Sequence, residues 1–139
     1  MKSKFFSIGL EEEYLIVNKY NGELIIDLPN NLMKECNKKL KQQVKPEFLK
    51  SQIEVRTKIC RNIGDLKESL IFLRKNISEI LTQYDLAPIA VSIHPFSGWE
   101  QQKHTEKRRY NALAEDFQIV GRRLVISGMH IHVGIPDNE

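Results

Sequence analysis

Three short segments of this chain alternate polar and apolar residues with a period of two. They lie at residues 9–14, 52–57 and 130–133. Successive side chains of a β-strand point to opposite faces, so each segment predicts a strand with one polar and one apolar face. Antiparallel sheets commonly leave one face in water and pack the other against the core. The alternation therefore predicts a sheet with one open, solvated face.

The remaining segments add helices and further strands, which predicts a mixed α and β fold. Residues 64–84 are the clearest expected helix, because apolar residues recur there at three- and four-residue steps. Asp65 and Glu68 have the spacing of a capping box, with Asp65 as the N-cap. Pro46 is expected to end the first helix, and the almost wholly apolar segment 87–93 is predicted to be a central strand. Strands are expected at residues 5–17, 23–27, 48–57, 87–93 and 124–135, and helices at 32–44, 64–84 and 106–120.

Length and composition limit the functions that the chain can have. With 139 residues it fits one domain, and its apolar fraction of 41% is that of a globular protein. The net charge of +3 is too small to predict nucleic-acid binding. No apolar run approaches the roughly 20 residues that cross a bilayer, and the first residues do not form a signal peptide. Cys36 and Cys60 have neither metal-site nor disulfide-framework spacing, which favours a reducing, cytoplasmic setting.

The predicted polar faces carry side chains that can bind metal ions and phosphate groups. If the three faces share one sheet surface, it carries Glu11, Glu13, Glu54, Arg56, His130 and His132. Carboxylates suit Mg²⁺ or Mn²⁺ and repel one another when no cation is present. An arginine can clamp a carboxylate or a phosphate, and a histidine can bind metal or donate to a phosphate oxygen. The alternation predicts that Glu12 points to the opposite face.

Each candidate also has a purely structural interpretation. The acidic triplet at residues 11–13 is compatible with an exposed edge or loop. Glu54 is compatible with a surface ion pair to Arg56. The pair of His130 and His132 fits a solvated polar face as well as it fits a metal site. The residue pattern taken alone leaves these alternatives open.

A second candidate segment is the sequence IHPFSGW at residues 93–99. His94 and Trp99 flank a proline-containing turn at the end of a predicted strand, and ligands often approach such loops. The structural interpretation is a turn in which Trp99 fills the core. Arg108 and Arg109 follow at the next predicted helix, where they either contact anionic groups or form a basic helix surface.

Four segments, in order along the chain, resemble the bacterial carboxylate-amine ligase family related to glutamate-cysteine ligase (the second glutamate-cysteine ligase family). They are GLEEEYLIV from Gly9, SQIEVRTKIC from Ser51, HPFSGW from His94 with KRRY from Lys107, and SGMHIHVGIPD from Ser127. The resemblance implies a glutamine-synthetase-like catalytic fold of the α+β class, with a mainly antiparallel sheet and helices on one face of it. It also implies ATP-dependent joining of a glutamate-type carboxylate to an amine, such as that of cysteine, through an acyl phosphate with divalent metals on the phosphates.

The resemblance assigns roles to the candidate residues. It implies that Glu11, Glu13 and Glu54 are metal ligands and that His130 faces both the metal and the nucleotide phosphates. We assign Arg56 and His132 as catalytic candidates and Arg109 as a nucleotide-binding candidate. The expected cofactors are ATP and Mg²⁺ or Mn²⁺, and the expected partners are a glutamate-like amino acid and an amine, with neither nucleic acid nor membrane.

Members of this family are typically more than twice as long as this chain. Residues 1–139 are therefore expected to form the N-terminal part of the catalytic domain, without its C-terminal part. Half of a sheet would expose an edge strand and apolar surface, so we expect a homo-oligomer or pairing with the missing C-terminal half. The alternative functions are an inactive truncated remnant of the family and a small His/Glu metal-binding module.

Overall fold

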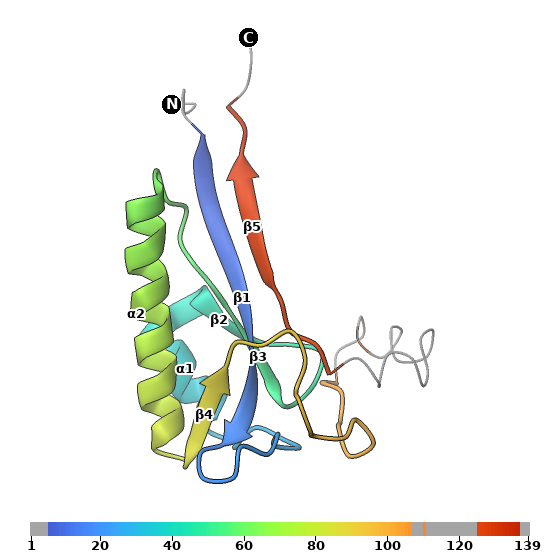
Figure 1. The fold of residues 1–139 in the computed structure, drawn as a ribbon. Helices are drawn as coiled ribbons and strands as arrows, with labels where there is room; N and C mark the ends of the chain where they lie inside the picture. The colour runs from blue at the N-terminus through green and yellow to red at the C-terminus, as the bar shows by residue number, and fades with distance from the viewer. Residues whose placement is uncertain (1–5, 107–109, 111–124, 137–139) are drawn as a thin grey trace.

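The computed structural model describes residues 6–106, 110 and 125–136, and these form one antiparallel sheet with helices on one side (Figure 1). The described elements are, in chain order, β1 Ser7–Asn18, α1 Leu32–Leu40, the short 3-10 helix η1 Lys41–Gln43, β2 Val44–Pro46, β3 Gln52–Arg56, α2 Ile63–Thr82, β4 Leu86–Ile89 and β5 Met129–Gly134. The predicted fold class, a mainly antiparallel α+β domain, is confirmed.

Strand β1 is the central strand of the sheet. On one edge it pairs with β3, from Glu11 opposite Arg56 to Leu15 opposite Gln52. Its other edge is shared, because β5 pairs with residues 7–12 of β1 and β4 pairs with residues 15–18. Figure 1 shows β5, in red, beside the upper half of β1, in blue. One long strand therefore aligns three shorter ones.

Both α-helices cover the same face of the sheet. Ile16 and Ile53 from the sheet pack there against Leu73 and Ile77 of α2 and Leu40 of α1, all of them buried. Burial of these side chains is the main contribution to the stability of the domain. Neither α-helix of the described residues is long and apolar enough to cross a membrane.

The buried carboxylate of Glu12 lies in this helix-covered layer. Its side chain is only 2% exposed and accepts two hydrogen bonds from the guanidinium of Arg74 on α2, one of them at 2.9 Å from Nε. It also accepts a hydrogen bond from the Tyr14 hydroxyl, and burial together with this bond raises the pKa of Tyr14. The predicted orientation of Glu12 is confirmed, and the residue ties α2 to the sheet.

The predicted helix boundaries need three corrections. The N-cap of α2 is Asn62 rather than Asp65, since the Asn62 side chain accepts a hydrogen bond from the Asp65 N–H at 2.9 Å. Helix α1 ends at Leu40, earlier than expected, and Lys41 then has a φ of 56°. Pro46 belongs to β2 and does not end the helix.

The strand predictions were less accurate at the sheet edges. Among the described residues, β4 pairs with β1 alone, so the segment predicted as a central strand is an edge strand. Residues 23–27 form no strand, and Leu24 makes only an isolated bridge with Val17. The predicted strand 48–57 begins later, at Gln52. The predicted helix 106–120 lies, apart from Glu106 and Tyr110, outside the described residues.

Candidate active site

Strand register brings the predicted polar residues onto one surface, on the face opposite the helices. Glu11 lies opposite Arg56 on β3 and opposite His130 on β5, and Glu13 lies opposite Glu54. His132 lies opposite Gly9 and shares this face. The condition stated for a common site, that the three polar faces share one sheet surface, is therefore met. Loop residues cover the other end of this face, where Leu15 and Val17 are buried with Leu49.

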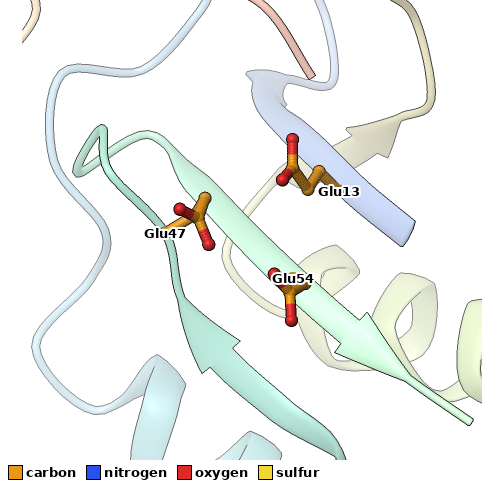
Figure 2. Close-up of side chains that lie close together, drawn as sticks. All are labelled: Glu13, Glu47 and Glu54. Atoms are coloured by element: carbon orange, nitrogen blue, oxygen red, sulfur yellow. The ribbon is translucent and has the colours of Figure 1, made fainter. Parts of the chain in front are cut away.

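Three carboxylates of this surface lie close enough to hold one metal ion. Glu13, Glu47 and Glu54 each offer an oxygen atom within 4.8 Å of the others. Figure 2 shows Glu13 on β1, Glu54 on β3 and Glu47 just beyond the end of β2. We call these three residues the carboxylate cluster. It joins the first strand of the chain to the hairpin that β2 and β3 form.

Backbone and side-chain contacts fix two members of the cluster. The N–H of Gly128 donates to Oε2 of Glu13 at 2.9 Å, and the N–H of Glu13 donates to the Gly128 carbonyl at 2.9 Å. The hydroxyl of Tyr110 donates to Oε1 of Glu47 at 3.0 Å. The two carboxylates are therefore oriented by residues distant in the sequence.

Glu54 is the deepest member of the cluster, with a side chain 4% exposed. Its buried Oε1 is in contact with two cationic side chains. The Nζ of Lys45 lies 2.9 Å from this oxygen and the Nε of Arg56 lies 3.7 Å from it. A buried carboxylate oxygen of this kind can still accept a metal ion.

Burial raises the pKa of both Glu54 and Glu13 above the ordinary value of 4.5. For Glu54, Lys45 opposes this effect while the charges of Glu11 and Glu47 add to it. For Glu13, the hydrogen bond from Gly128 opposes it and the charge of Glu47 adds to it. A divalent cation would relieve the same repulsion that a proton relieves.

The donor set of the cluster fits Mg²⁺ or Mn²⁺. These cations prefer hard oxygen ligands, and all three candidate ligands are carboxylates. The carboxylate of Glu54, 4% exposed, provides the most buried of these ligands. The residues present therefore fit the metal that the sequence pattern predicts.

These pKa shifts predict that Glu13 and Glu54 contribute less to the stability of the metal-free protein as the pH rises. A carboxyl group with a raised folded pKa binds its proton more tightly in the folded protein, so its stabilising effect is full below 4.5 and is lost as the pH rises through the raised value. From pH 4.5 upward, we expect the unfolding free energy of Glu54→Gln to increase relative to that of wild type. Urea unfolding in a chelator at several pH values measures this difference, and a difference independent of pH would contradict the prediction.

Glu11 and the two histidines lie beside the carboxylate cluster rather than in it. Oε2 of Glu11 lies 3.4 Å from Nε2 of His132, and its Oε1 lies 4.0 Å from Nε of Arg56. His130 is exposed, and its charge lowers the pKa of Glu13. The predicted metal roles of Glu11 and His130 and the catalytic roles of Arg56 and His132 stay predictions. Arg109 lies outside the described residues.

Glu47 is the site residue that the sequence analysis missed. The expected helix 32–44 and the stop at Pro46 left Glu47 in a loop. The missed signal is the alternation of Val44, Lys45, Pro46 and Glu47, in which the polar residues take every second position. Lys45 pairs with Glu54 in the structure, so Glu47 lies on the same face two residues further on.

The segment 93–99 is a structural turn in the described structure. Nδ1 of His94 accepts a hydrogen bond from the Ser97 N–H at 3.0 Å, so in the neutral ring Nε2 carries the proton and donates to the Gly22 carbonyl at 3.0 Å. Trp99 packs against the buried cluster that contains Leu15. Both ring nitrogens of His94 are used in holding two loops together.

The fold and the carboxylate cluster together define an α+β domain with a candidate cation site on its open sheet face. The sequence profile of glutamate-cysteine ligase family 2 matches residues 7–139. The chain therefore belongs to glutamate-cysteine ligase family 2.

Named relatives of this chain are considerably longer than the chain itself. It is 47% identical to a protein of Rhodospirillum rubrum named "Putative glutamate-cysteine ligase 2", over 100% of this chain and 37% of that one. A protein of the same name from Jannaschia sp. is also 47% identical, over 96% of this chain and 35% of the relative. The chain thus spans about a third of these relatives and corresponds to their N-terminal part.

Solved structures share the fold at low sequence identity. The glutamate-cysteine ligase of Francisella tularensis, solved in complex with AMP, superposes with a TM-score of 0.72 at 16% identity, covering 96% of this chain and 28% of that chain. A bifunctional glutathione synthetase from Pasteurella multocida gives a TM-score of 0.69 at 18% identity, covering 93% and 17%. These similarities support the predicted fold class.

Proposed function

We propose that this chain supplies the N-terminal part of the active site of an ATP-dependent carboxylate-amine ligase. The observation that carries the proposal is the carboxylate cluster on the open sheet face, formed by a chain that belongs to a ligase family. Glutamate is the proposed carboxylate substrate and an amino acid such as cysteine the proposed amine. The two free, buried cysteines fit the proposed cytoplasmic setting.

The proposed reaction has two steps. A carboxylate oxygen of the substrate attacks the γ-phosphorus of ATP, which forms an acyl phosphate and releases ADP. The amine then attacks the acyl carbon, an amide bond forms, and phosphate leaves with the electron pair of the broken C–O bond. Neither step needs a side-chain nucleophile, and Cys36 is unsuited to be one because burial raises its pKa to about 11.

Side chains of the open face would position the reacting groups. Glu13, Glu47 and Glu54 would hold Mg²⁺ or Mn²⁺, and the bound cation would neutralise charge on the nucleotide phosphates. Arg56 and His132 are the candidates for stabilising an anionic group, since both are exposed beside the cluster. His130 and Arg109 are the proposed nucleotide contacts.

The rest of the site would come from the polypeptide that the longer relatives carry beyond the matched region. Strand β5 favours such an addition, because among the described residues it pairs with β1 alone. Ile131 and Val133, on its helix-side face, are 61% and 59% exposed. A further strand and a covering helix would bury them. Self-association of two copies through the same edge is the second proposed arrangement.

We expect Mg²⁺ to strengthen ATP binding by this chain, and Glu13→Gln to weaken that binding by at least about tenfold, because one ligand charge is lost. Isothermal titration calorimetry with and without Mg²⁺ measures both effects. Glu79→Gln is the matched control, since Glu79 lies far from the open face and pairs with Lys39. Equal ATP affinity with and without Mg²⁺ would argue against the proposal.

Turnover requires a separate measurement. ADP release is followed with glutamate and several amines, in the presence and absence of the remaining part of the Rhodospirillum rubrum relative. We expect turnover only with the added part. Cation-dependent ATP binding without turnover in either condition would favour the inactive remnant, and tight Zn²⁺ binding through His130 and His132 without a response to nucleotide would favour the metal-binding module.

A further inference from the structure

We propose that Lys45 is an internal counter-cation of the carboxylate cluster. Its ammonium group neutralises Glu54 when no metal is present and must leave Glu54 when a divalent cation binds. Lys45 therefore competes with the metal and sets the metal affinity of the cluster. This inference rests on the proposed function, because it takes Glu13, Glu47 and Glu54 as the metal site.

Strand pairing places Lys45 at the cluster. Lys45 lies directly opposite Glu54 in the register of β2 and β3, so both side chains share the open face. Its Nζ atom lies 2.9 Å from Oε1 of Glu54. The charge of Lys45 also lowers the pKa of Glu13, the cluster member on β1. One ammonium group thus acts on two of the three carboxylates.

The two partners of this ion pair differ in their access to water. The Glu54 side chain is 4% exposed, whereas that of Lys45 is 35% exposed. A lysine has a flexible four-carbon stem and can turn its ammonium group into solvent, but the Glu54 carboxylate stays buried. A buried carboxylate that loses its counter-charge is strongly destabilised. Lys45 can therefore leave only when another cation takes its place.

A metal ion and the ammonium group cannot share Oε1 of Glu54 without strong repulsion. Mg²⁺ binds its oxygen ligands at about 2.1 Å, and an ammonium group in contact with the same oxygen would be only a few ångströms from the ion. Two cations at that separation repel each other strongly beside the buried Glu54 carboxylate. Arg56 is more distant, at 3.7 Å, and has Glu11 as a second carboxylate partner.

The first test measures Mn²⁺ affinity of the nucleotide-free chain by isothermal titration calorimetry. Lys45→Met keeps the stem and removes the charge, and we expect it to bind Mn²⁺ about tenfold more tightly than wild type, which corresponds to about 1.4 kcal/mol. Lys45→Arg keeps the charge and should return the affinity towards that of wild type. Lys39→Met is the matched control, because it removes the exposed Lys39–Glu79 pair and should leave Mn²⁺ affinity unchanged.

The second test uses wild-type protein and does not depend on how the variants fold. The rate at which Lys45 is acetylated at low reagent concentration is measured by mass spectrometry. It should be slow in chelator and several-fold faster with saturating Mn²⁺, because the metal displaces the Lys45 side chain from Glu54. Lys39 serves as the internal reference and should show no response to Mn²⁺.

The outcomes separate this inference from the proposed function. Mn²⁺ binding that is equal or weaker in Lys45→Met, or acetylation of Lys45 that Mn²⁺ does not accelerate, would overturn the counter-cation role and leave the metal site intact. Absence of Mn²⁺ binding in both wild type and Lys45→Met would overturn the metal site itself, and the present inference with it.

Discussion

Replacing Glu12 with alanine is expected to lower the unfolding free energy by about 2 kcal/mol, because it leaves a buried hydroxyl and a half-exposed guanidinium without their acceptor. The Glu12 carboxylate is 2% exposed and accepts hydrogen bonds from Arg74 and Tyr14. The substitution leaves a partly buried guanidinium and a buried hydroxyl without their acceptor, and both penalties add to the lost hydrogen bonds. Urea unfolding followed by circular dichroism measures the change.

The control for Glu12→Ala is Glu79→Ala, which removes an exposed ion pair between α2 and α1. Exposed pairs contribute little, so this change should be much smaller. Equal losses in the two variants would show that Glu12 does not tie α2 to the sheet. Because Glu12 points away from the open face, Glu12→Ala protein that remains folded should still bind Mn²⁺.

Replacing Glu54 with glutamine is expected to weaken Mn²⁺ binding by at least about 100-fold, since the deepest ligand of the cluster loses its charge. The same change should stabilise the metal-free protein at neutral pH, because it removes a buried charge from a repelling group. Calorimetry gives the affinity and chelator-treated unfolding gives the stability. A lower Mn²⁺ affinity together with a higher unfolding free energy of the metal-free variant would show that Glu54 serves metal binding at a cost in stability.

Glu11→Gln is a suitable comparison for Glu54→Gln, because Glu11 lies on the same face but outside the carboxylate cluster. It should weaken Mn²⁺ binding far less. A larger effect for Glu11→Gln than for Glu54→Gln would mean that the metal is bound nearer to His130 and His132, as the resemblance to the ligase family implied. A loss of stability in metal-free Glu54→Gln would contradict the assigned charge repulsion.

The sequence was sufficient to predict which residues share a face. Alternation within a strand is fixed by backbone geometry, so Glu11 and Glu13 were separated from Glu12 without knowledge of the fold. The same rule placed Glu54 with Arg56 correctly. Which strands are neighbours depends on tertiary packing. The apolar segment 87–93 illustrates this, because its strand pairs with β1 alone among the described residues and none of its residues is buried.

Errors at element ends explain the missed part of the site. Helical spacing appeared to continue to residue 44. A helix predicted up to that residue excluded the strand β2, which carries Lys45 and positions Glu47. Element ends depend on a few contacts that propensity does not reveal. Asn62 was passed over as the N-cap for a similar reason, because Asp65 also had a suitable spacing to Glu68.

The contact between Glu13 and Gly128 has a consequence for how the protein is made. The two residues are 115 positions apart, so the Glu13 carboxylate is oriented by backbone that is synthesised 115 residues later. Pairing of such distant segments is slow to form and costs loop entropy. A nascent or truncated chain that ends before β5 would carry all three carboxylates yet lack the group that aligns the first of them. The alignment of Glu13 in the carboxylate cluster thus requires that the last described strand first joins β1.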